Sequence, residues 1–103
     1  MDKPRIIKSY EKLDDLLIDQ VKLAYPYGFD KKLIQFKGIK GEFISALPFE
    51  TEDHLYLIKM TRSEAQAIVE EDEDYDDDGF LTEDAQERIE EELDDDMDDY
   101  EED

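Results

Sequence analysis

Apolar and polar residues alternate with a period of two in three short runs between residues 33 and 60. That period places successive side chains on opposite faces of a β-strand. The runs are rich in Phe, Ile, Leu and Tyr, which suit a half-buried pleated surface. Gly38 and Gly41 bracket a turn after the first run, and residues 51–53 separate the second run from the third. The pattern therefore predicts an antiparallel meander.

The segment before the meander predicts one strand and one helix. Residues 5–10 contain two adjacent isoleucines and favour a short first strand. Apolar residues then recur at helical spacing over residues 15–25, and Asp14 is a suitable N-cap. Pro26 and Gly28 end this helix, because neither residue continues a helix well.

Helix signals return directly after the meander. Thr61 and Glu64 have the spacing of a capping box, which predicts a short helix over residues 62–70. Further on, Thr82 is a candidate cap for another helix. Three apolar residues follow it at intervals of four, namely Ala85, Ile89 and Leu93. This stripe is thin, and like charges at neighbouring helical positions oppose the helix.

Charge divides the chain into two parts. Residues 1–60 carry ten Lys/Arg and ten Asp/Glu, whereas residues 61–103 carry two Arg and 23 Asp/Glu, and so the whole formal net charge of −21. A segment this acidic repels itself and buries too little apolar surface to order itself. We therefore expect an α+β domain over residues 1–70: a meander of three to four strands, one N-terminal helix and a short following helix. Residues 71–103 are expected to form an acidic, low-complexity and largely disordered tail.

Composition narrows the function classes. The chain has no Cys and a single His, His54, which argues against a transition-metal site and against disulfides. No apolar stretch reaches the length of a membrane span, and no signal-peptide pattern is present, so we expect a cytoplasmic protein. The sequence has no Gly-rich phosphate loop, and its paired carboxylates lie in the tail, where burial does not raise their pKa. These features favour a non-enzymatic protein without a cofactor.

One acidic string has the spacing of a cation site. Asp74, Asp76 and Asp78, followed by Gly79, match the first part of an EF-hand calcium loop. The twelfth position, where that loop needs a bidentate Glu, falls on Ala85. Asp-rich segments also produce such strings by chance. The alternatives at this stage are a calcium site and weak, unselective condensation of Ca²⁺ or Mg²⁺ on the tail.

Candidate partner-binding residues lie in both parts of the chain. Four lysines surround the first strand of the meander and its turn: Lys31, Lys32, Lys37 and Lys40. They form either a basic patch or a scattered, solvated edge. In the tail, Tyr75 and Tyr100 are candidate stacking anchors for a partner. Because the tail repels phosphates, we expect a basic protein partner, itself nucleic-acid-binding, and neither direct nucleic-acid nor membrane contact.

Residues 8–60 resemble a group of small bacterial proteins with acidic tails that often carry the label "DNA primase". The match has no gaps over about half of the chain, and where the group has a helix-starting Thr-Pro this chain has Asp14-Asp15. The resemblance implies the domain limits and a bacterial cytoplasmic setting. The similar residues are Tyr10, Lys12-Leu13, Pro26, Gly28-Phe29, Ile34, Phe36-Lys37, Gly41-Glu42, Thr51-Glu52-Asp53 and Tyr56-Leu57-Ile58-Lys59.

These observations lead to one expected function and two alternatives. The expected function is a non-enzymatic interaction module whose polyanionic tail mimics nucleic acid toward a basic partner that handles nucleic acid. One alternative is a calcium-binding module built on the string from Asp74 to Gly79. The other, implied by the resemblance alone, is a role in DNA replication together with a primase.

Overall fold

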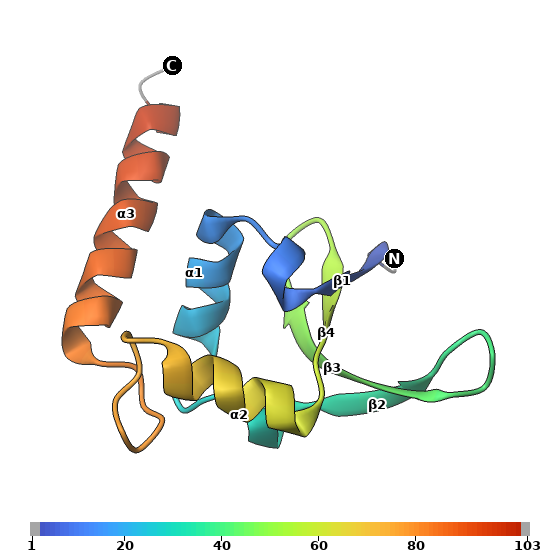
Figure 1. The fold of residues 1–103 in the computed structure, drawn as a ribbon. Helices are drawn as coiled ribbons and strands as arrows, with labels where there is room; N and C mark the ends of the chain where they lie inside the picture. Colours follow the sequence, from blue (N-terminus) through green and yellow to red (C-terminus); the bar gives the residue numbers. More distant parts are fainter. Residues whose placement is uncertain (1–2, 102–103) are drawn as a thin grey trace.

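The computed structural model describes the backbone of residues 3–101 and the side chains of residues 3–94. It is an α+β fold in which one four-stranded sheet packs against helices (Figure 1). The strands lie in the order β1-β4-β3-β2. Their bounds are β1 Arg5–Ser9, β2 Ile34–Lys37, β3 Phe43–Glu50 and β4 Leu55–Lys59.

The predicted meander is confirmed as β2-β3-β4, with antiparallel pairing at both of its junctions. In the long middle strand, Leu47 lies opposite Ile58 and Ala46 opposite Ile34. The first strand, β1, pairs parallel to β4, with Ile7 beside Leu57, and this makes the sheet mixed. A parallel neighbour needs a long crossover connection. Here the crossover contains the whole N-terminal helix and two strands.

Within residues 3–101, three α-helices accompany the sheet, together with the short 3-10 helices η1 Tyr10–Lys12 and η2 Asp30–Lys32. The first, α1, spans Asp15–Ala24, and the Asp14 side chain accepts a hydrogen bond from the Leu17 amide, as the N-cap prediction requires. The second, α2, spans Arg62–Glu71 and begins with the predicted capping box. The third, α3, spans Glu83–Glu101. Among the described residues, no helix is long and apolar enough to cross a membrane.

The core lies between one face of the sheet and the helices. Alternate residues of β3 and β4, including Leu47 and Ile58, point into it, and both side chains are fully buried. Val21 of α1 and Phe29, in the loop after α1, are also fully buried there. Gly28 permits the tight turn before Phe29, because its φ of 95° lies in the region that favours glycine.

The packed unit continues beyond residue 70, where the sequence places its end. Tyr75 belongs to the same core cluster and is only 6% exposed. Ala85 and Ile89 of α3 are also buried, and α3 packs beside α1 (Figure 1). Residues 72–94 are therefore part of the folded domain, because a few apolar side chains at helical spacing pack against it. Residues 102–103 lie outside the described part of the chain.

The β2–β3 hairpin extends away from the helices, at the opposite side of the molecule from α3 (Figure 1). Its turn closes through hydrogen bonds between Gly38 and Glu42 and between Gly41 and Gly38. Ile39 at the tip is fully exposed, and Phe43 at the start of β3 is 70% exposed. The hairpin thus presents apolar side chains that the rest of the chain does not cover.

Candidate functional site

Helix α3 carries the acidic surface of the protein over residues 83–94, where its side chains are described. Between positions 83 and 94, α3 exposes every one of its carboxylates. They number seven, and one of them, Glu92, also approaches Asp19 of α1. These residues are Glu83, Asp84, Glu87, Glu90, Glu91, Glu92 and Asp94.

A thin apolar stripe and a cap hold this acidic helix. The Thr82 hydroxyl accepts a hydrogen bond from the Ala85 amide at 3.1 Å, which is the geometry of an N-cap. Ala85 and Ile89 are buried and Leu93 is half-buried, so the predicted stripe is confirmed. The side chain of Tyr100, a candidate partner anchor, lies outside the described residues.

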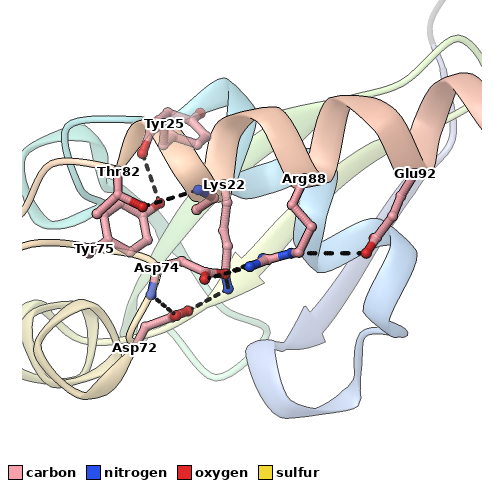
Figure 2. Close-up of polar contacts among 9 residues, drawn as sticks. Lys22, Tyr25, Asp72, Asp74, Tyr75, Thr82, Arg88 and Glu92 are labelled. Atoms are coloured by element: carbon pink, nitrogen blue, oxygen red, sulfur yellow. Dashed lines mark hydrogen bonds and ion pairs between the residues drawn. The ribbon is translucent and has the colours of Figure 1, made fainter.

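An ion-pair cluster joins the acidic segment to the domain (Figure 2). The ammonium of Lys22 on α1 lies 2.6 Å from a carboxylate oxygen of Asp72 and 2.8 Å from one of Asp74. Arg88 of α3 then binds Asp74 with both terminal nitrogens, at 3.1 Å and 2.7 Å. We call Lys22, Asp72, Asp74 and Arg88 the anchoring cluster. It connects α1, the loop after α2, and α3.

The pKa values of the anchoring cluster follow from these contacts. The hydrogen bonds from Arg88, followed by those from Lys22, lower the pKa of Asp74 to about 2, against the opposing effect of burial. For Lys22 burial favours the neutral amine, but Asp72 and Asp74 together outweigh it and raise the pKa of the ammonium. The hydrogen bonds to Asp74 likewise raise the pKa of Arg88, so Lys22, Asp74 and Arg88 are charged at neutral pH.

Tyr75 lies beneath the anchoring cluster and is part of the core. Its hydroxyl donates a hydrogen bond to the Tyr25 carbonyl oxygen at 3.0 Å, and its ring packs edge-on against Phe29 at 5.9 Å between centroids. The Tyr25 hydroxyl in turn donates to the Pro48 carbonyl oxygen. Burial raises the pKa of Tyr75, and raises that of nearby Tyr10 to about 12. The expectation that Tyr75 is presented to a partner is therefore wrong, because its ring and hydroxyl are both used inside the domain.

A second polar contact between α1 and α3 is repulsive at neutral pH. Asp19 of α1 and Glu92 of α3 bring two carboxyl groups together. Burial, followed by the hydrogen bond to Glu92 and its charge, raises the pKa of Asp19. The contact between the helices therefore becomes more favourable as Asp19 takes up a proton.

Two of the three carboxylates of the predicted calcium string are engaged by other groups of the protein. Asp74 is held by Lys22 and Arg88. The Asp76 side chain accepts hydrogen bonds from the amides of Asp78 and Phe80, at 2.9 Å and 3.0 Å, and so stabilises its own turn. Among the described residues no group of three or more His, Cys, Asp or Glu side chains is placed to hold a metal ion. In this string Asp76 therefore stabilises a turn, and Asp74 forms an ion pair beside it.

The four candidate lysines are exposed but lie at two separate places. Lys31 and Lys32 are in η2, which contacts α2, whereas Lys37 and Lys40 are at the far end of the hairpin. Lys37 places its ammonium 5.9 Å from the centroid of the Phe43 ring. Strand β2 begins after Lys31 and Lys32 and ends at Lys37, and its four residues span roughly 13 Å. The lysines therefore form two small groups, and α3 does not lie over either of them in Figure 1.

No protein-family model, curated protein or solved structure matches the chain.

The anchoring cluster was missed by reasoning from the sequence. The contacts of Lys22 join residues 50 and 52 positions apart, and local patterns carry no information on such pairs. A signal is nevertheless present. Arg88 is the only basic residue between positions 63 and 103. A single cation in so acidic a segment indicates a specific carboxylate partner.

Proposed function

We propose that the protein is a non-enzymatic interaction module. Its acidic helix α3, with the acidic residues that follow, imitates the phosphate backbone toward a basic protein that handles nucleic acid. The observation that carries the proposal is the ordered row of seven exposed carboxylates between Glu83 and Asp94. The proposal also places the protein in the cytoplasm, where such partners act.

Charge density along α3 supports the mimicry. Twelve helical residues span about 18 Å at a rise of about 1.5 Å per residue. Seven carboxylates over that length give about one charge per 2.6 Å, between the spacings of about 3.4 Å for one DNA strand and about 1.7 Å for a duplex. A nucleic-acid-binding channel of a partner has Lys and Arg side chains that neutralise phosphates. The carboxylates of α3 offer that channel a density of negative charge similar to that of a phosphate backbone.

The anchoring cluster supports the proposal in a second way. Arg88 and Lys22 hold the base of α3 against α1, and Ile89 is buried at the same junction. The helix that carries the carboxylates between Glu83 and Asp94 is therefore anchored to the domain before binding. A preordered charged surface loses less conformational entropy on association than a flexible acidic chain does.

The test is affinity capture from the source cell at low salt with the full-length chain. The informative variant changes four outward carboxylates of α3 to amides: Glu87→Gln, Glu90→Gln, Glu91→Gln and Asp94→Asn. The matched control changes four exposed carboxylates of the domain: Asp15→Asn, Glu42→Gln, Glu52→Gln and Asp53→Asn. Both variants have the same formal net charge, so any difference between them reports position and not total charge.

The proposal predicts that the unaltered chain and the control capture a basic, nucleic-acid-binding protein, and that the α3 variant loses it. Circular dichroism verifies that the α3 variant keeps its helices. Equal capture by the unaltered chain, the α3 variant and the control would overturn the proposal, as would a captured set without any basic nucleic-acid-binding protein.

A further inference from the structure

An open groove of about 480 Å³ lies between η1, the adjoining ends of β3 and β4, and α2. Its apolar lining comes from three elements, η1, β3 and α2, and from the residue after β4: Tyr10, Phe43, Ile44, Met60 and Ile68. Met60 is buried, whereas Phe43 is 70% exposed. The volume lies within the range of about 300–1,000 Å³ that is usual for ligand sites.

The charged residues that line the groove are mostly acidic. Glu11, Glu64 and Glu71 line it, against the single cation Lys59. One oxygen of Glu64 accepts the Thr61 amide in the capping box, which leaves its other oxygen for a ligand. The groove therefore combines an apolar floor with a net negative rim.

The acidic rim continues toward the anchoring cluster. A second hollow shares Tyr10, Ile68 and Glu71 with the groove and adds residues 72–74. Asp72 and Asp74 there are paired with Lys22 and Arg88, and Arg88 lies on α3. A line of carboxylates thus leads from the apolar groove to the base of the acidic helix.

We infer that this groove binds an amphipathic basic segment of a protein partner. The apolar side chains of that segment cover Phe43 and Ile68, and its Lys or Arg residues face Glu11, Glu64 and Glu71. The inference rests on the proposed function, because the basic partner of α3 supplies the segment. Charge complementarity selects this occupant: a second copy of the chain, at a formal net charge of −21, is repelled, and an acidic or neutral apolar segment leaves the rim without counter-charges.

The test uses three synthetic helical peptides and fluorescence anisotropy with the full-length chain at physiological salt. The first peptide has Leu at positions i, i+3, i+4 and i+7 and Lys elsewhere. The second replaces each Leu with Ser and so keeps the charge alone. The third replaces each Lys with Glu. The inference predicts tightest binding of the Leu/Lys peptide, weaker binding of the Ser/Lys peptide and no binding of the Leu/Glu peptide.

The informative variant is Phe43→Ser, and the matched control is Ile39→Ser at the hairpin tip, outside the groove. Phe43→Ser should lower the affinity for the Leu/Lys peptide about tenfold or more, because it removes an aromatic anchor. It should not change the affinity for the Ser/Lys peptide, and Ile39→Ser should not change the affinity for either peptide. As a measurement free of substitutions, backbone amide spectra of the unaltered chain should change on Leu/Lys addition at Phe43, Ile44, Ala67 and Ile68.

Failure of the groove and failure of the proposed function give different results. If Phe43→Ser has no effect and the amide shifts lie only along α3, the groove inference is overturned while the role of α3 stands. If Phe43→Ser weakens binding of the Leu/Lys peptide but the four-amide α3 variant captures the basic nucleic-acid-binding protein as well as the unaltered chain does, the groove stands and the proposed function falls. Equal affinity for the Leu/Lys and Ser/Lys peptides would also overturn the groove inference.

Discussion

Lys22 holds the acidic C-terminal part of the domain to α1 through its ion pairs with Asp72 and Asp74. Its side chain is 9% exposed, and it faces two carboxylates that are themselves largely covered. Burying a charge is unfavourable without a partner, and here each partner stabilises the other. From the sequence alone, Lys22 looks like an ordinary lysine in the last turn of a helix. Its role follows from residues that lie 50 and 52 positions further along the chain.

Lys22→Met should destabilise the protein by about 2–3 kcal/mol. The substitution leaves Asp72 and Asp74 facing each other with only Arg88 to neutralise them. Urea unfolding followed by circular dichroism measures the change. Lys32→Met, which removes an exposed lysine of η2, is the control and should stay within about 0.5 kcal/mol of the unaltered chain. Equal stability of the two variants would contradict this role for Lys22.

Asp74 should make the stability of the protein depend on pH in the acid range. Because its pKa falls from 3.8 in the unfolded chain to about 2 in the folded protein, its stabilisation is complete above 3.8. That stabilisation is lost as the pH falls from 3.8 toward 2. Asp74→Asn should therefore be less stable than the unaltered chain at pH 6, with a difference that narrows by pH 2. A difference that is constant across this window would show that Asp74 is not held as described.

At the scale of elements, α3 shows how an acidic helix is held by a few side chains. Ala85, Ile89 and Leu93 give it one narrow apolar face, and Thr82 gives it a cap. The sequence offers this helix as a candidate from its stripe, but it favours a largely disordered tail, because the surrounding acids have the composition of a disordered segment. The packing of the helix on α1 is therefore not predicted. In the same way, two adjacent isoleucines predict β1 as a strand, but its parallel pairing with β4 depends on distant contacts.

The α1–α3 contact should become more stable when its repulsive pair is removed. The folded protein raises the pKa of Asp19, so the ionised group destabilises the contact at neutral pH, and the penalty disappears as the pH falls through that raised pKa. Asp19→Asn should therefore raise the free energy of unfolding at pH 7 by roughly a few tenths of a kcal/mol. Thermal unfolding at pH 7 and pH 3 measures it: the gain should be present at the first pH and absent at the second. A gain in stability of the same size at both pH values would mean that the substitution acts through packing and not through charge.

For the whole molecule, charge is divided between two regions that share one core. Residues 1–60 are neutral in sum, whereas the acids gather on α3 and on the loop before it. Charge counting predicts this division correctly. The boundary that it places at residue 70 is earlier than the end of the packing, because Tyr75 and Ile89 are buried. The acidic region is thus anchored to the domain, and its removal at residue 70 would also remove part of the core.

The central claim is that the carboxylates of α3 occupy the place of nucleic-acid phosphates on a partner. Competition measures this most directly. The partner captured by the full-length chain is bound to fluorescent single- or double-stranded nucleic acid, and the chain is then titrated in. We predict full displacement by the unaltered chain, weaker displacement by the four-amide α3 variant, and an affinity that falls steeply with salt. A ternary complex, in which the partner holds the chain and the nucleic acid together with undiminished affinity for both, would contradict the claim.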